Sequence, residues 1–150
     1  MTAIDCPETS RTIYKLCKER KIPVNVADVP SECDFYFGSQ YRDGPLQVMV
    51  STNGNGPKLA NIIREQIAAG IPENAGDAIT KVGKLRQKLR EMAPGNEQGP
   101  KRMKWMIQVC EKWTLNDFIS MSEQDMDELL QNYESGIVPP AKDIISEEFS

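Results

Sequence analysis

Asp28 is the residue of this sequence best placed to carry out acid–base chemistry. It ends the short apolar run 24–27 and is followed by a proline turn. Ligands of open parallel sheets bind beyond the carboxyl ends of the strands, where a carboxylate can act as a general base or face a metal. The alternative is that Asp28 is a turn residue that caps local amides.

The absence of histidine narrows the choice of catalytic groups. It excludes Ser–His and Cys–His nucleophilic systems, histidine-ligated zinc and the usual proton carrier near neutral pH. Proton transfer therefore falls to Asp, Glu, Lys, Tyr, Cys or water, and we assign no residue to a metal. The cysteines lack CxxC spacing and are interpreted as free, buried thiols in a reducing compartment. They are Cys6, Cys17, Cys33 and Cys110.

The second candidate site is the loop of residues 51–57, which contains Gly54 and Gly56. Exposed amides next to the start of a helix bind anions. The glycine, lysine and Ser/Thr order of a P-loop is absent, so the glycines alone are a weak signal. An ordinary strand-to-helix loop is the alternative interpretation.

The residues before these sites predict a parallel crossover unit. Residues 1–5 have the pattern of a strand end, Pro7 opens a helix, and residues 24–28 return as a strand. One such unit cannot form a stable doubly wound sheet. We therefore expect earlier strands of the same domain to precede it.

A β-hairpin is predicted next, with strands over residues 33–38 and 45–51 and a turn signal at Asp43-Gly44. A lone hairpin is marginal in water, so we expect a partner sheet from another subunit. A helix then begins at Pro57. Its apolar stripe is Leu59, Ile62, Ile63 and Ile67.

The rest of the chain is predicted to be helical. Helices are expected over residues 74–92 and 100–113, over a short segment capped by Thr114, and after a capping arrangement at Ser122. The stripe of the first helix is Ile79, Val82, Leu85, Leu89 and Met92. The stripe of the second is Met103, Met106, Ile107 and Cys110.

The other face of helix 74–92 is basic and is either solvated or a surface for a polyanionic ligand. Its cations are Lys81, Lys84, Arg86, Lys88 and Arg90. The chain as a whole carries a net charge of −4, which leaves no basic surplus for nucleic acid. No apolar run approaches the ~20 residues of a membrane span, and the start lacks the features of a signal peptide. We expect a cytoplasmic protein without nucleic-acid or membrane partners.

Several motifs occur together in order: PE (7–8), IYKLCKER (13–20), VNVAD (24–28), CDFYFG (33–38), STNG (51–54), KVGKLR (81–86) and MAP (92–94). With this order and spacing the sequence resembles the yeast-type bifunctional siroheme synthases, over about residues 1–135. That family combines precorrin-2 dehydrogenase and sirohydrochlorin ferrochelatase activities.

The resemblance implies an α/β remnant of an NAD-binding Rossmann domain over residues 1–32. A dimerisation region of β-hairpin plus helix, with strands exchanged between subunits, then covers 33–72. An all-α domain covers 73–135, and a loose tail covers 136–150. The implied protein is a homodimer whose active site lies in a cleft between the first two regions.

By the same resemblance, Asp28 is the acid/base of both precorrin-2 oxidation and Fe²⁺ insertion, with NAD as cofactor, Fe²⁺ as a substrate and a tetrapyrrole as ligand. NAD contacts are assigned to Thr2, Ala3 and Asn25. Tetrapyrrole contacts are assigned to Ser51, Thr52, Asn53 and Gly54. The sequence departs from the family in lacking the glycine-rich dinucleotide fingerprint. A non-catalytic module that dimerises and binds tetrapyrrole, or an unrelated α/β fragment, is the alternative.

Overall fold

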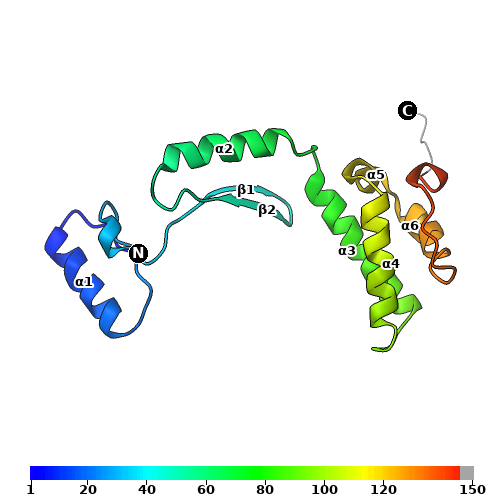
Figure 1. Ribbon diagram of the computed structural model, residues 1–150, viewed down its shortest axis with the longest axis horizontal. Coiled ribbons are helices and arrows are strands. Elements are labelled where there is room, and N and C mark those ends of the chain that lie inside the picture. The colour runs from blue at the N-terminus through cyan, green and yellow to red at the C-terminus, as the bar shows by residue number, and fades with distance from the viewer. Residues whose placement is uncertain (146–150) are drawn as a thin grey trace. The chain divides into compact units, whose positions relative to one another are not determined.

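The computed structural model describes residues 1–145 as a mixed α/β chain of helices with one two-stranded sheet (Figure 1). In chain order the elements are α1 (Pro7–Glu19), η1 (Pro30–Glu32), β1 (Ser39–Asp43), β2 (Leu46–Val50), α2 (Pro57–Ala69), α3 (Ala75–Met92), α4 (Gly99–Lys112), α5 (Leu115–Ser120), α6 (Glu123–Leu130) and η2 (Ala141–Asp143). The chain divides into two units. The first unit comprises residues 1–41 and 48–69, and the second comprises residues 42–47 and the chain from 70 onward.

In the first unit, α1 is flanked by two extended segments that meet at one parallel bridge, between Thr2 and Val26. The Thr2 amide donates to the Asn25 carbonyl at 2.9 Å, and the Ala27 amide donates to the Thr2 carbonyl at 3.0 Å. The predicted strand–helix–strand unit is therefore confirmed, although its two strands pair at only a single bridge. Its strands stay short because no further strand pairs with them among residues 1–145.

The hairpin forms, but the strand predicted over residues 33–38 is wrong. The strand that pairs with β2 is β1, which directly precedes the turn at Gly44. Residues 33–38 are held elsewhere in the first unit. The Asp34 amide donates to the Val24 carbonyl at 2.7 Å, and the Asn25 side-chain amide donates to the Phe35 carbonyl at 2.8 Å. A tight turn pairs the residues directly before and after it, so the strand partner of β2 must end at the turn. Residues 34 and 35 are bonded to Val24 and Asn25, and β1 begins after them, at Ser39.

The tip of the hairpin contacts the start of α3 in the second unit. The Asp43 carboxylate accepts a hydrogen bond from the Gly76 amide at 2.8 Å and so caps the helix, whose own N-cap residue Asn74 makes no side-chain cap bond. A Cβ atom on Gly76 would lie 2.2 Å from the Asp43 carbonyl oxygen. The contact therefore requires glycine at this position.

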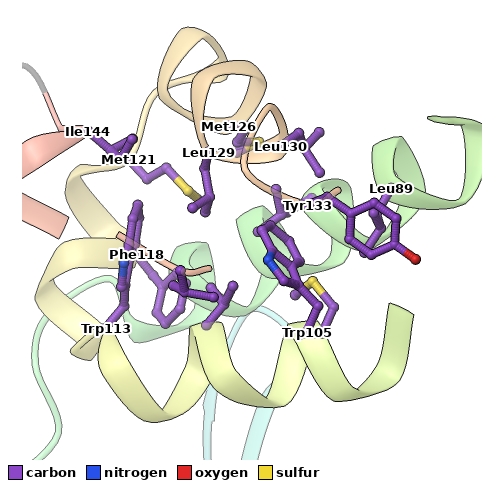
Figure 2. Packing of buried hydrophobic residues seen from close by; sticks show 14 of the residues in the cluster. Leu89, Trp105, Trp113, Phe118, Met121, Met126, Leu129, Leu130, Tyr133 and Ile144 are labelled. Atoms are coloured by element: carbon purple, nitrogen blue, oxygen red, sulfur yellow. The ribbon is translucent and has the colours of Figure 1, made fainter. Parts of the chain in front are cut away.

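The hydrophobic core of the second unit is built by α3, α4, α5, α6 and the segment that follows them (Figure 2). The Trp105 and Tyr133 rings meet edge to face at 5.7 Å. Trp113 packs on Phe118 and donates from its indole nitrogen to the Pro139 carbonyl at 3.0 Å. Such aromatic pairs bury large areas, which accounts for the concentration of the core here.

Part of the segment expected to be a loose tail belongs to this core. Val138 and Ile144 are buried, and Lys112 donates to the Val138 carbonyl at 2.7 Å. Both apolar residues belong to the core cluster of the second unit. The remainder of the expected tail, residues 146–150, lies outside the described residues.

The helix starts predicted at Thr114 and Ser122 are confirmed. Each residue accepts a hydrogen bond from the amide three positions later, and Asp117 and Asp125 return the bond to the cap amide. Both are complete capping boxes. These bonds form between neighbours in the sequence, so a sequence pattern can indicate them.

The predicted inward faces are only partly right. On α3, Leu85 and Leu89 are buried as expected, but Ile79 and Met92 are 40% and 47% exposed. Ala78 takes the place of its larger neighbour in the core. Ala75 and Gly76, next to the hairpin tip, are buried as well.

On α4 the predicted stripe is rotated. Trp105, Met106 and Val109 are buried, whereas Met103 and Ile107 are 63% and 51% exposed. Trp105 decides which side of the helix faces inward, since a buried tryptophan removes more apolar area from water than either exposed residue.

The cysteines are unpaired as predicted, but none is buried, because Cys6 and Cys110 are exposed and Cys17 and Cys33 are half-buried.

Candidate functional site

The first unit contains a pocket of about 340 Å³, within the size range of small-molecule sites. It brings together three residues that the sequence analysis assigned to ligands, namely Asn25, Thr52 and Gly54. Its other lining residues are Tyr36, Phe37, Gly38, Ser39, Pro57, Ala60 and Asn61. The pocket therefore lies where the loop after β2 meets the segment before β1.

Gly54 is required at the wall of this pocket for two reasons. Its φ angle is 79°, a conformation that favours glycine. A Cβ atom there would also lie 2.7 Å from the ring of Tyr36. The Tyr36 hydroxyl donates to the Pro30 carbonyl at 3.3 Å, which holds the ring against the loop. Sequence reasoning missed Tyr36, although its place in the aromatic run 35–37 was visible.

Three amides of the loop are occupied by the loop itself, and one of them is the Asn55 amide, which donates to the Thr52 carbonyl at 3.0 Å. The Asn53 amide donates to the Ser51 hydroxyl at 3.2 Å, and the Gly56 amide donates to the Thr52 hydroxyl at 3.1 Å. These contacts are those of a self-stabilised strand-to-helix loop. Neither Ser51 nor Asn53 lines the pocket. The groups that remain for a ligand are neutral, because no charged side chain belongs to the lining.

Asp28 lies outside this lining. It sits in a turn closed by a bond from the Val29 amide to the Val26 carbonyl at 3.2 Å, with a left-handed φ of 61°. Cys33 braces the turn by donating from its thiol to the Val26 carbonyl at 3.2 Å. The Asp28 carboxylate is exposed and bonds to no other described residue, so the alternative role of capping local amides is not seen.

Asp34 anchors the segment that carries the pocket aromatics. Its carboxylate pairs with Lys18 and accepts a bond from the Val24 amide at 3.0 Å. The hydrogen bond from Lys18, and then that from Val24, hold the pKa of Asp34 below its usual value. The same contact raises the pKa of Lys18. Sequence reasoning gave Asp34 no role, and no local signal points to this pairing across 16 positions.

Of the residues assigned to NAD, Thr2 and Asn25 are joined by the hydrogen bond between the two extended segments. Thr2 is buried and its hydroxyl oxygen has no partner within residues 1–145, while Ala3 is exposed. Asn25 alone of the three lines the pocket. The first glycine of the chain is Gly38, so residues 1–37 contain no glycine-rich turn for a pyrophosphate. These residues alone therefore do not fit NAD.

A second hollow, of about 430 Å³, lies between α3 and α4 in the second unit. It is lined by Val82, Arg86, Leu89, Arg90, Gly99, Arg102, Met103, Met106, Ile107, Cys110 and Glu111. We call it the α3–α4 groove. Sequence reasoning assigned its apolar residues to the core and so missed it.

The part of the chain that the structure describes contains no helix long and apolar enough to cross a membrane. Within the same residues, no group of three or more acidic or thiol side chains is arranged to hold a metal ion.

Three family models match consecutive parts of the chain. A putative NAD(P)-binding family matches residues 1–39. The central region of sirohaem biosynthesis proteins matches residues 43–69. Their C-terminal region matches residues 72–139.

Individual relatives agree with these matches. A siroheme biosynthesis protein of Schizosaccharomyces pombe is 56% identical over 130 residues, which cover 87% of this chain and 49% of that protein. One of Saccharomyces cerevisiae is 42% identical over 114 residues, covering 70% of this chain and 41% of that protein. A siroheme synthase of Thioalkalivibrio sulfidiphilus is 38% identical over 97 residues, 65% of this chain and 20% of that protein. The chain thus spans about half the length of the first of these relatives and less of the others.

Proposed function

The chain belongs to the family of siroheme biosynthesis proteins, and we propose that it supplies the proton-transfer and tetrapyrrole-binding part of a siroheme synthase. The whole protein would oxidise precorrin-2 to sirohydrochlorin with NAD and insert Fe²⁺ to give siroheme, in the cytoplasm. The observation that carries this proposal is the 56% identity that extends over 87% of the chain.

We assign proton transfer to Asp28. Oxidation of the tetrapyrrole requires loss of a proton from the macrocycle, and metal insertion requires loss of protons from pyrrole nitrogens as Fe²⁺ enters. A carboxylate that is exposed and unpaired can accept such protons. Asp28 meets this condition among the described residues, and it lies in a left-handed turn at the end of the extended segment.

We assign one part of the tetrapyrrole to the pocket of the first unit. Thr52, Gly54 and Asn25 line it, and the Tyr36 and Phe37 rings provide apolar surface for a flat macrocycle. Ser51 and Asn53 support the loop in this scheme. The assignment of Thr2 and Ala3 to NAD remains a prediction, and NAD binding would require further residues that form a phosphate-binding turn.

The proposed domain scheme has a Rossmann remnant over 1–32, a dimerisation region over 33–72 and an all-α domain over 73–135. Its central region is supported by the exposure of α2. Only Ala60 of that helix is buried, while Leu59, Ile62 and Ile67 are 55%, 40% and 42% exposed. A second copy covering this stripe and extending the two-stranded sheet would form the homodimer.

The test of the catalytic assignment is Asp28→Asn in the full-length protein. We expect the rates of precorrin-2 oxidation and of Fe²⁺ insertion, followed by absorbance, to fall at least about a hundredfold, the usual contribution of a general base. The matched control is Asp5→Asn, another exposed carboxylate of the first unit without a partner among the described residues. Wild-type rates in the Asp28 variant would contradict the assignment.

A non-catalytic module is the second candidate. The observation that favours it is that Asp28 lies outside the lining of the first-unit pocket. Titration of the chain with sirohydrochlorin, with and without NAD and Fe²⁺, separates the two functions. Binding without turnover favours the module, and turnover favours the enzyme.

A further inference from the structure

We propose that the α3–α4 groove is by itself a binding site for a tetrapyrrole, at which Arg86 and Arg90 bind carboxylates of the macrocycle. This inference rests on the proposed function and assigns the ligand to residues that the resemblance leaves without a role. It begins from a mismatch in the first pocket. That pocket has no charged lining residue, whereas the proposed substrate is rich in carboxylates.

The floor of the groove is apolar and open to solvent. Met103 and Ile107 are 63% and 51% exposed, and they lie beside the buried Leu89 and Met106. Exposed apolar side chains gathered in one patch mark interaction sites and ligand-binding grooves. The volume of about 430 Å³ suits a small molecule or the edge of a larger one.

The cations of α3 separate into two groups. Lys81 donates to the Ile119 carbonyl, Lys84 pairs with Glu123 at 2.9 Å, and Lys88 pairs with Asp127 at 2.6 Å. The fold therefore uses the lysines to attach α3 to α5 and α6.

Arg86 and Arg90 form the other group and line the groove. Neither makes a hydrogen bond or an ion pair with any residue that the structure describes. They are one helical turn apart, so both guanidinium groups are on the same side of α3. Two unpaired arginines above an apolar floor form a site for an amphipathic anion.

The chemistry of arginine favours carboxylates at this position. A guanidinium group can donate two parallel hydrogen bonds to one carboxylate, which a lysine cannot. A tetrapyrrole combines a flat apolar ring with carboxylates on its rim, and so complements both the floor and the arginines. Arg102 donates to the Ala93 and Gly95 carbonyls, which fixes a third positive charge at the groove. Glu111 lines it too and repels carboxylates from its own position, which favours one orientation of the ligand.

The test is a titration of the 150-residue chain with sirohydrochlorin, followed by absorbance. Arg86→Gln and Arg90→Gln should each raise the dissociation constant about tenfold, as expected for loss of a charge-assisted hydrogen bond. Arg86→Lys should recover part of the affinity because it keeps the charge. The control is Lys104→Gln, which removes an exposed and unpaired cation of α4 outside the groove and should leave the dissociation constant within about twofold.

A second readout uses the thiol of Cys110, which lines the groove and is exposed. Sirohydrochlorin should slow alkylation of Cys110 by iodoacetamide, measured by peptide mass mapping. The internal control is Cys6, an exposed thiol of the first unit, whose alkylation rate should not change. Circular dichroism verifies that each variant keeps its helix content.

The outcomes separate this inference from the proposed function. If the wild-type chain binds sirohydrochlorin but the arginine variants bind equally well and Cys110 is not protected, the groove site is wrong and the proposed function stands. If raising the protein concentration alone protects Cys110, a second copy covers the groove and the inference is wrong. If the wild-type chain does not bind sirohydrochlorin, both proposals fail for this chain.

Discussion

Among single residues, Asp34 shows how one carboxylate can organise a segment. It joins α1, through Lys18, to the extended residue Val24 and to the aromatic run that lines the first pocket. Because its pKa is lower in the folded chain than in the unfolded one, the contact stabilises the fold above the unfolded pKa. This contribution is lost as the pH falls through the folded-state pKa.

We predict that the carboxyl group of Asp34 titrates with a midpoint below 3.8, the ordinary value, in a carbon-detected NMR titration. Removing the positive partner with Lys18→Met should move the midpoint upward, since the hydrogen bond from Lys18 is the largest cause of the shift. The Val24 amide should lose its protection from hydrogen exchange over the same pH range. A wild-type midpoint at or above 3.8 would rule out the role given to this pair.

Alanine substitution at two glycines of α3 is predicted to change the free energy of unfolding in opposite directions. Gly76→Ala should lower the free energy of unfolding by about 1–3 kcal/mol, because the new Cβ overlaps the backbone of Asp43. Gly83→Ala should raise it by about 0.5–1 kcal/mol, because nothing lies within 4 Å of that position and alanine favours helix. Urea unfolding followed by fluorescence of Trp105 and Trp113 reports on this unit. Effects of the same sign in both variants would contradict the structure.

Among elements, α6 is stabilised more by its N-terminal capping box than by its surface ion pairs. Ser122 and Asp125 close a complete capping box at the start of the helix. The ion pair between Lys84 and Glu123, at 2.9 Å, joins side chains that are 55% and 57% exposed, so water and salt screen it.

We therefore predict that Ser122→Ala lowers the free energy of unfolding by about 1 kcal/mol. Lys84→Met should lower it by less than about 0.5 kcal/mol, and molar salt should abolish only this second effect. Ser120→Ala, at the exposed last residue of α5, is the matched control. The ranking fails if the lysine variant is the more damaging in urea unfolding.

In the molecule as a whole, more of the exposed large apolar side chains belong to the first unit than to the second. Leu59, Ile62 and Ile67 of the α2 stripe are exposed, and the hairpin pairs with no other described strand. A two-stranded sheet is marginal alone, so association with a second copy would stabilise it.

The prediction for the whole molecule is a dimer in sedimentation velocity experiments. Ile67→Glu should raise the dimer dissociation constant at least about tenfold, since it puts a charge on the α2 stripe. Gln66→Glu adds the same charge at a neighbouring exposed position and should change it little. A wild-type chain that stays monomeric at all concentrations would exclude the proposed dimer.

The bounds of α3 and α4 could be predicted from the sequence to within one residue, and so could the starts of the other α-helices. Pro7 and Pro57 open helices, and Thr114 and Ser122 close capping boxes with residues three positions away. These signals are readable because they depend on backbone preferences and bonds within one helical turn.

The faces and sites depended on contacts between distant residues, which no local pattern contains. Trp105 turned α4 so that Met103 and Ile107 line a groove instead of the core. The bond from Asn25 to the Phe35 carbonyl displaced the predicted strand and brought Asn25 to the pocket with Thr52. Sequence motifs thus located the candidate residues. Packing between distant segments decided which of them lie together, because the free energy gained by burying a side chain depends on all the elements that contact it.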